Sequence, residues 1–209
     1  IFRWDGPNDD DLDDYLLLFA RSGRGNAYLS IDNDGVLFGT ILQYNSAIDN
    51  ENRLSYPIDQ GVWYHVVYTY DVETGELRLF INGELVDENN YPFEQYYQMN
   101  GSNTRVGNYY FNHEPAYFHG SVAFAQFVND VLFESGENVL PSTSPHENAI
   151  IFWEMNEGSG NTTFDSSVNG NHGTINGATW VENIYGCTDQ YADNYDETVT
   201  VDDGSCTYP

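Results

Sequence analysis

The sequence predicts an all-β fold, an antiparallel β-sandwich followed by a small disulfide-closed C-terminal tail. Short apolar runs recur along the 209 residues, and no long stretch has the periodicity of a helix. Asn-Gly and Asp-Gly pairs separate several of these runs, as they do in β-hairpins. Aromatic residues, which favour strands, are abundant, with 17 Tyr, 12 Phe and 4 Trp.

The first half of the chain contains the clearest strand patterns. The run that begins at Tyr15 is continuous and apolar, whereas the run from Ala27 turns at Asp34-Gly35 and resumes as VLFGTILQY. A later run, VWYHVVYTYD, precedes turns at Thr74-Gly75 and Asn82-Gly83. Between these two turns, the period-2 alternation of a strand places Leu77, Leu79 and Ile81 on one face, with Arg78 and Phe80 on the other.

The second half of the chain is less regular. A polar and aromatic stretch at 88–103 has the composition of a long loop, after which strand patterns return. We predict four parts: the main part of the sandwich at 1–140, a linker at 141–149, strands that complete the sandwich at 150–183, and an acidic module at 186–209.

The charge of the chain excludes some partners. It has 33 acidic residues and six basic ones, all of them Arg, which gives a net charge of −27. Such a surface repels nucleic-acid phosphates and anionic lipid, so no nucleic-acid partner is expected, and it attracts divalent cations. No apolar run approaches the ~18 residues of a membrane span.

The two cysteines predict where the protein works. Cys187 and Cys206 lie close together in the tail, which predicts a local disulfide and an oxidising compartment. We therefore expect an extracellular or secreted protein on a cell or virion surface. The start at IFRWDG, without Met or a signal peptide, suggests a position inside a longer precursor.

The stretch WYHVVYTYDVETGELRLFINGELVD resembles the laminin G-like domains of the concanavalin A-like lectin/glucanase superfamily. The positions that match are Trp63, His65, Val66, Tyr70, Asp71, Gly75, Asn82 and Gly83. The resemblance implies a jelly-roll of two packed antiparallel sheets.

The segment FDSSVNGNHGTINGATW, residues 164–180, resembles a part of the same family that usually precedes the first core strand. Here it follows the linker, which implies that the strands at 150–183 replace ones missing before residue 1. They close the sandwich of their own chain or, by strand donation, that of a neighbouring subunit. We favour closure within the chain.

In the family, the turn within the segment at 164–180 commonly contributes to a calcium site. The resemblance therefore implies that Asp165, Asn169 and Asn171 are calcium ligands. Carboxylate and amide oxygens suit calcium. The family often adds an acidic residue from a late strand, where this chain has Ala123. The alternative is a structural turn in which Asp165 and Asn171 cap backbone amides.

The tail resembles a short acidic two-cysteine repeat of secreted proteins from marine bacteria and their viruses. Crowded carboxylates repel one another unless they are neutralised, so we predict a second calcium site in the tail. Its ligands are Asp189, Asp202 and Asp203. The alternative is a solvated acidic face.

Aromatic and amide side chains in predicted loops form a candidate glycan-binding surface. Aromatic faces stack on the apolar faces of sugars, and amides bind their hydroxyls. The candidates are Tyr96, Tyr97, Asn108, Tyr109, Tyr110 and Asn112. The alternative is that many of these aromatics cover the rim of the core.

Catalysis is not expected. Superfamily glucanases have Glu-x-Asp-x-Glu on one strand, a pattern that this sequence lacks, and Glu154 and Glu157 are predicted to point to opposite faces of a strand. The leading hypothesis is a non-catalytic, calcium-dependent recognition or adhesion module for glycans or other cell-surface ligands. The alternatives are a self-assembling subunit of a filament, appendage or virion coat, and an accessory domain of a glycan-degrading enzyme.

The calcium hypothesis predicts that a chelator lowers the melting temperature, because an ion bound only to the folded state stabilises it. Thermal unfolding with calcium, and with chelator at the same ionic strength, measures this effect. Equal melting temperatures would rule out both calcium sites.

Overall fold

The computed structural model describes most of the chain as strands and tight turns. The described residues are 1–7, 16–21, 25–43, 53–71, 73–91, 104–111, 114–130, 144–182, 185–187, 189, 191–196, 198–199, 201–202 and 205–208. Every element within these ranges is a strand, which confirms the all-β prediction. All strand pairs in them are antiparallel except one short pair in the tail.

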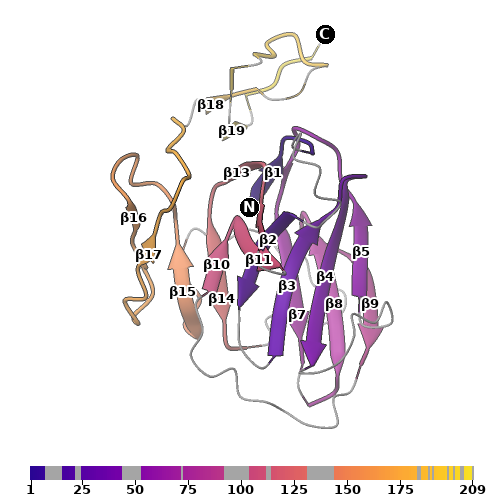
Figure 1. Ribbon diagram of the computed structural model, residues 1–209. Coiled ribbons are helices and arrows are strands. Elements are labelled where there is room, and N and C mark those ends of the chain that lie inside the picture. Colours follow the sequence, from indigo (N-terminus) through magenta and orange to yellow (C-terminus); the bar gives the residue numbers. More distant parts are fainter. Residues whose placement is uncertain are drawn as a thin grey trace.

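The larger sheet has five strands and forms one layer of the sandwich (Figure 1). In spatial order they are β10 (Thr104–Val106), β2 (Leu16–Arg21), β3 (Gly25–Ile31), β4 (Val36–Gln43) and β5 (Arg53–Pro57). The β3–β4 hairpin turns at Asp34-Gly35, as predicted, where Gly35 has a positive φ of 79°.

The remaining strands form shorter groups, of which β7–β9 lie behind the larger sheet and β14 and β15 lie to its left in Figure 1. One group is β7 (Val66–Tyr70), β8 (Glu76–Ile81) and β9 (Glu84–Asn90). A second group is β13 (Gly120–Val122), β1 (Phe2–Trp4) and β6 (Trp63–Tyr64). A third is β14 (Ala125–Val128) with β15 (Ala149–Trp153).

Three small strand pairs lie around the sandwich. They are β11 (Asn108–Phe111) with β12 (Glu114–Tyr117), β16 (Thr162–Thr163) with β17 (Gly173–Thr174), and the parallel pair β18 (Tyr185–Gly186) with β19 (Val201–Asp202). The pair β16–β17 lies beside β15, and the tail lies at one end of the molecule (Figure 1).

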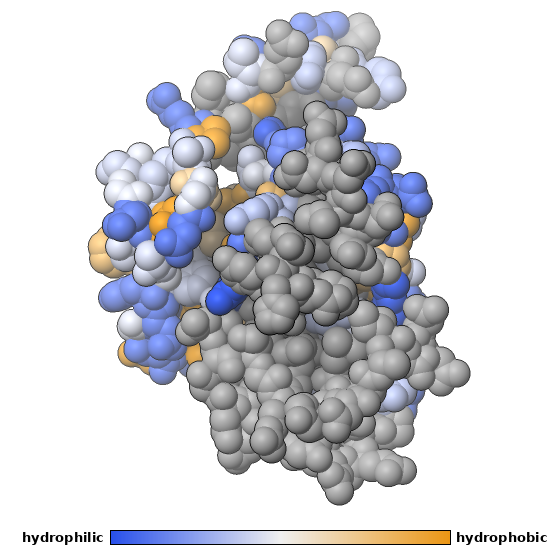
Figure 2. Space-filling model, in the orientation of Figure 1, coloured by the Kyte–Doolittle hydropathy of each residue, from blue (hydrophilic) through white to orange (hydrophobic). Residues whose placement is uncertain are grey.

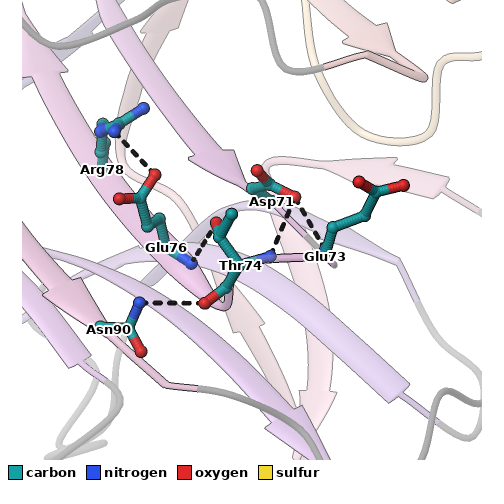
Figure 3. Close-up of polar contacts among 6 residues, drawn as sticks. All are labelled: Asp71, Glu73, Thr74, Glu76, Arg78 and Asn90. Atoms are coloured by element: carbon teal, nitrogen blue, oxygen red, sulfur yellow. Dashed lines mark hydrogen bonds and ion pairs between the residues drawn. The ribbon is translucent and has the colours of Figure 1, made fainter.

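The turns of the β7–β8–β9 sheet explain several residues of the family pattern. The Asp71 carboxylate accepts hydrogen bonds from the amides of Glu73 (2.8 Å) and Thr74 (3.4 Å), which lowers the Asp71 pKa (Figure 3). Asn82 and Gly83 both have positive φ, 51° and 91°, as a tight hairpin turn requires. Asp71, Asn82 and Gly83 therefore shape hairpin turns, and these positions of the family pattern specify backbone geometry.

The core lies between the two layers, where the inward-facing residues of both sheets meet. Leu77, Leu79 and Ile81 of β8 are buried together, as the alternation predicted. They pack in one cluster with residues of the larger sheet and β1: Ile31, Leu37, Leu54, Phe2 and Trp4. Because inward residues alternate with outward ones, this core fixes which side chains the larger sheet presents to the outside.

Three boundaries differ from the prediction. The run at 62–71 is interrupted at His65, whose amide donates to the Asn82 side chain and whose carbonyl accepts from the Asn82 amide. Within 172–182, only Gly173–Thr174 is in strand conformation. β15 begins at Ala149, inside the predicted linker, because the backbone of Ala149 already pairs with Val128.

Gly39 on β4 permits a close contact between the layers. A Cβ atom at this position would lie 2.6 Å from Cδ2 of the Tyr68 ring, far inside van der Waals contact. Tyr68 comes from β7 in the opposite layer and packs against the core. The absence of a side chain at Gly39 therefore makes room for the Tyr68 ring.

We expect Gly39→Ala to destabilise the fold by ~1–3 kcal/mol, the usual cost of overpacking a core. Urea unfolding measures this loss. The cost should be smaller when Tyr68 is first replaced by Leu, because the clashing ring is then absent. An equal cost in both backgrounds would show that the Gly39–Tyr68 contact does not limit the layer spacing.

Candidate functional site

The outer face of the larger sheet carries aligned aromatic, hydroxyl and guanidinium side chains. Register pairs Tyr28 with Thr40, and Thr40 with Arg53. The next outward row pairs Phe38 with Ser30 on one side and with Ser55 on the other. The residues between these rows, Leu29, Gly39 and Leu54, belong to the inward row. We call Tyr28, Ser30, Phe38, Thr40 and Arg53 the outer platform.

The outer platform combines ring faces with hydrogen-bonding groups. Tyr28, Phe38 and Arg53 are partly exposed, whereas Ser30 and Thr40 are buried. The guanidinium carbon of Arg53 lies 3.2 Å from the Phe38 ring centre. The buried Ser30 hydroxyl has no hydrogen-bond partner in the described part of the chain. A buried hydroxyl without a protein partner is uncommon in folded proteins.

The structure brings together some of the predicted glycan-binding residues. Asn108, Tyr109 and Tyr110 lie on β11, which follows β10 after a bend at Gly107 (φ 80°) and contacts β2. They therefore lie beside the larger sheet. Three further candidates, Tyr96, Tyr97 and Asn112, lie outside the described residues.

The outer platform was not predicted, because the aromatic candidates came from predicted loops, whereas Tyr28, Phe38 and Arg53 lie on strands. A signal was present, since Tyr28 and Ser30 alternate with Leu29 and Ile31 along β3. Which of the two alternating sets faces outward was decided by the opposite sheet, which buries the aliphatic set.

The predicted calcium turn at residues 164–172 is organised around the Asp165 carboxylate. Asp165 is 7% exposed, and its oxygens accept four hydrogen bonds. The donors are the amides of Phe152 (2.8 Å), Ser167 (2.9 Å) and Asn171 (2.7 Å), and the Ser167 hydroxyl (2.8 Å). Burial raises the Asp165 pKa, but these hydrogen bonds outweigh burial and lower it.

The same turn covers the outer edge of β15. The Asn169 and Asn171 side chains donate to the carbonyls of Ala149 (2.8 Å) and Ile150 (2.9 Å), respectively. The Ser166 amide donates to the Phe152 carbonyl at 2.9 Å. The β15 backbone is thus bound to β14 on one edge and to this turn on the other, which blocks the addition of another strand.

These contacts give Asp165, Asn169 and Asn171 a structural role, close to the alternative in which the turn caps backbone amides. Both Asp165 oxygens already accept hydrogen bonds, so an ion at this carboxylate would compete with those donors. Calcium binding here stays a prediction.

The carboxylates after β15 also hold the turn. Glu154 accepts a hydrogen bond from the Ser166 hydroxyl (2.7 Å), and Glu157 accepts one from the Phe164 amide. Both follow the end of β15 at Trp153, so they do not alternate along a strand as predicted. Figure 2 shows the surface over β15–β17 as mostly hydrophilic with scattered hydrophobic residues. Val168, between β16 and β17, is 95% exposed.

The tail is closed by a disulfide between Cys187 and Cys206, as predicted. Asp189 accepts hydrogen bonds from the Tyr208 hydroxyl and the Tyr191 amide, which lower its pKa. Asp202 lies on β19, and Asp203 lies outside the described residues. In the ranges that the structure describes, no three His, Cys, Asp or Glu side chains are placed to hold a metal ion. The tail calcium site also stays a prediction.

We expect Asp165→Asn to lower the free energy of unfolding by ~2–3 kcal/mol at pH 7, since an amide cannot replace a buried, hydrogen-bonded carboxylate. The folded-state pKa of Asp165 lies below that of unfolded Asp, about 3.9. The carboxylate therefore contributes stability above that pH, and the contribution is lost as the pH falls through the lowered pKa.

Urea unfolding of both proteins at a series of pH values measures the difference, which should shrink below about pH 4. Asp34→Asn is the matched control, because it removes the same charge from an exposed turn residue. A difference that does not change with pH would contradict the charged role of Asp165.

Comparison with known proteins places this geometry in a family. The family described as the concanavalin A-like lectin/glucanases superfamily matches residues 4–135. No curated protein gave a significant match. The described part of the chain contains no helix of sufficient length and apolarity to cross a membrane. The likeness of the tail to an acidic two-cysteine repeat stays a prediction.

The structure is similar to the crystal structure of a candidate carbohydrate-binding protein from Bacteroides ovatus. The TM-score is 0.57 at 16% sequence identity, over 87% of this chain and 54% of that one. The chain thus spans about half the length of that protein, and at this identity the likeness concerns the fold. With the two-layer sandwich and the match over 4–135, the chain belongs to the concanavalin A-like lectin/glucanases superfamily.

Proposed function

We propose that the chain is a non-catalytic extracellular module that binds a carbohydrate across the outer platform. The carrying observation is the juxtaposition of Tyr28 and Phe38 on adjacent strands, with Arg53 stacked on Phe38. Membership of a lectin/glucanase superfamily supports the proposal. So does the similar fold of the Bacteroides ovatus protein, which is described as carbohydrate-binding.

The chemistry of the outer platform suits a sugar chain. On one face of a sheet, diagonal cross-strand neighbours such as Tyr28 and Phe38 lie about 7–8 Å apart, so their rings can contact successive sugar units. Ring faces stack on the C–H faces of pyranoses, and Tyr28 and Phe38 are the partly exposed rings of the outer platform. The Ser30 and Thr40 hydroxyls are buried beneath the proposed contact surface. We propose that Asn108 extends this surface, because its strand β11 contacts β2.

Two observations support a non-catalytic extracellular role. The Glu154 and Glu157 carboxylates accept hydrogen bonds from a hydroxyl and a backbone amide of the turn at 164–172. These contacts favour a structural role for the two carboxylates over a role as a catalytic pair. The Cys187–Cys206 disulfide persists in oxidising surroundings. Calcium dependence, including ions at Asp165 or Asp189, remains a secondary part of the proposal.

Self-assembly is the alternative function. The covered outer edge of β15 makes strand exchange between copies at that edge unfavourable, because its donors and acceptors are already occupied. An accessory role within a larger glycan-degrading enzyme is compatible with the same binding face.

We expect a glycan array, run with and without calcium, to identify a ligand, whose affinity is then measured by titration calorimetry. Tyr28→Ala and Phe38→Ala should each weaken that binding about tenfold, the loss of one aromatic stacking contact. Tyr191→Ala is the matched control, because Tyr191 is an exposed aromatic residue of the tail.

An array without any bound glycan, together with oligomers in solution, would favour the structural-subunit alternative. If a glycan binds and both platform variants bind it like the parent protein, the module recognises carbohydrate through another face. Melting temperatures of all variants confirm that each is folded.

A further inference from the structure

Asn-Gly pairs recur along the chain, and each is a candidate site of spontaneous chemical change. The pairs are Asn82-Gly83, Asn100-Gly101, Asn169-Gly170 and Asn176-Gly177. Because glycine has no Cβ, its backbone amide can approach the preceding asparagine side chain closely. The reacting residues are the same in every pair, so the fold decides how their reactivities differ. Asn100-Gly101 lies outside the described residues, and the structure allows a comparison of the other three pairs.

Asn82 is held by two contacts of its hairpin turn. Its side-chain oxygen accepts a hydrogen bond from the His65 amide at 2.9 Å, and its own amide donates to the His65 carbonyl at 2.8 Å. The following Gly83 is buried. The Asn82 side chain must therefore leave His65 before it can react, and burial shields the glycine from the base that would remove its amide proton.

Asn169 is held against the outer edge of β15. Its side-chain nitrogen donates to the Ala149 carbonyl at 2.8 Å and to the Ile150 carbonyl at 3.4 Å. The Gly170 carbonyl accepts a hydrogen bond from the His172 amide at 2.9 Å, which restrains the backbone after the pair. Both the side chain and the backbone of this pair must therefore move before they react.

Asn176-Gly177 has none of these restraints. The pair follows β17, on the segment that leads toward the tail (Figure 1), and both residues are exposed. Within the described part of the chain, neither the Asn176 side chain nor the backbone of the pair makes a hydrogen bond. A Cβ atom at Gly177 would have no neighbouring atom within 4 Å. The flanking anchors are the Ile175 amide and the Trp180 indole, each of which donates a hydrogen bond at 2.9 Å.

We propose that Asn176 is a site of spontaneous modification, at which the chain deamidates to aspartate and isoaspartate. Hydroxide removes the proton of the Gly177 amide, and the amide nitrogen forms a bond to Cγ of Asn176. The bond between Cγ and Nδ2 then breaks, and Nδ2 takes up a proton from water and leaves as ammonia. The product of this step is a five-membered succinimide ring. Water opens the ring at either of its two carbonyl carbons, which gives aspartate or isoaspartate.

The reaction changes both charge and backbone at an exposed position. Each converted molecule gains a carboxylate, on a chain whose net charge is already −27. Isoaspartate also lengthens the main chain between Ile175 and Trp180, because the side-chain carbon becomes part of the backbone. Asn176 makes no hydrogen bond in the described part of the chain, so its conversion removes none. The protein therefore accumulates a charge variant with age.

The test keeps the folded chain at mildly alkaline pH and follows each pair by peptide mapping and mass spectrometry, with digestion at acidic pH. Asn176 should convert about tenfold faster than Asn82 and Asn169, because no hydrogen bond has to break first. Isoaspartate should appear together with aspartate at residue 176, since the succinimide gives both. The rate should rise with pH, because the attacking amide must lose its proton.

The chain unfolded in guanidinium chloride is the matched control, because it has the same sequence without the contacts. In this control, Asn82, Asn169 and Asn176 should convert at similar rates. Asn176→Gln should abolish the early product and leave Asn82 and Asn169 unchanged, since glutamine would have to close a larger ring. Gly177→Ala should slow the conversion severalfold, because the added methyl group crowds the approach of the amide.

Equal conversion at Asn82, Asn169 and Asn176 in the folded chain would overturn this inference. The same ratio of rates in the folded and the unfolded chain would also overturn it, because the sequence and not the fold would then set the rates. Aspartate without isoaspartate at residue 176 would show direct hydrolysis and exclude the proposed succinimide. None of these outcomes bears on glycan binding, so the proposed function is tested separately.

Discussion

The close contact between Gly39 and the Tyr68 ring is part of the packing between the two layers, on which the outward face of the larger sheet depends. It lies in the same row as Leu29 and Leu54, which pack inward against β8. Because strand side chains alternate, burying this row forces its neighbours outward, and a register slip of one residue would exchange the two sets. The position of Tyr28 and Arg53 on the surface is therefore a consequence of core packing beneath them.

A different kind of interaction, between the side chains of one turn and the backbone of a strand, covers the outer edge of β15. β15 follows the linker in sequence, yet it pairs with β14, and its other edge is covered by side chains of the turn at 164–172. Asp165 is central because one carboxylate accepts three backbone amides and a hydroxyl that would otherwise lack partners in a confined turn. Asp165, Asn169 and Asn171, the predicted calcium ligands of this turn, therefore cover the outer edge of β15.

The charged residues of the protein are not spread evenly over its strands. A net charge of −27 describes the whole chain, but the strands of the larger sheet contain arginine and no carboxylate. Of these arginines, Arg53 lies over the Phe38 ring of the neighbouring strand, 3.2 Å from its centre.

By itself, the sequence determined the all-β class, the hairpin turns at Asp34-Gly35 and Asn82-Gly83, and the disulfide, because these depend on local backbone chemistry and short sequence separation. Only the tertiary structure decided that the outer platform exists, because Tyr28, Thr40 and Arg53 are brought into one row by the pairing of three strands. It likewise assigned the Asp165 oxygens to backbone amides, since the partner Phe152 amide belongs to another strand. Local signals specify strands and turns, whereas the rows across a sheet depend on which strands pack together.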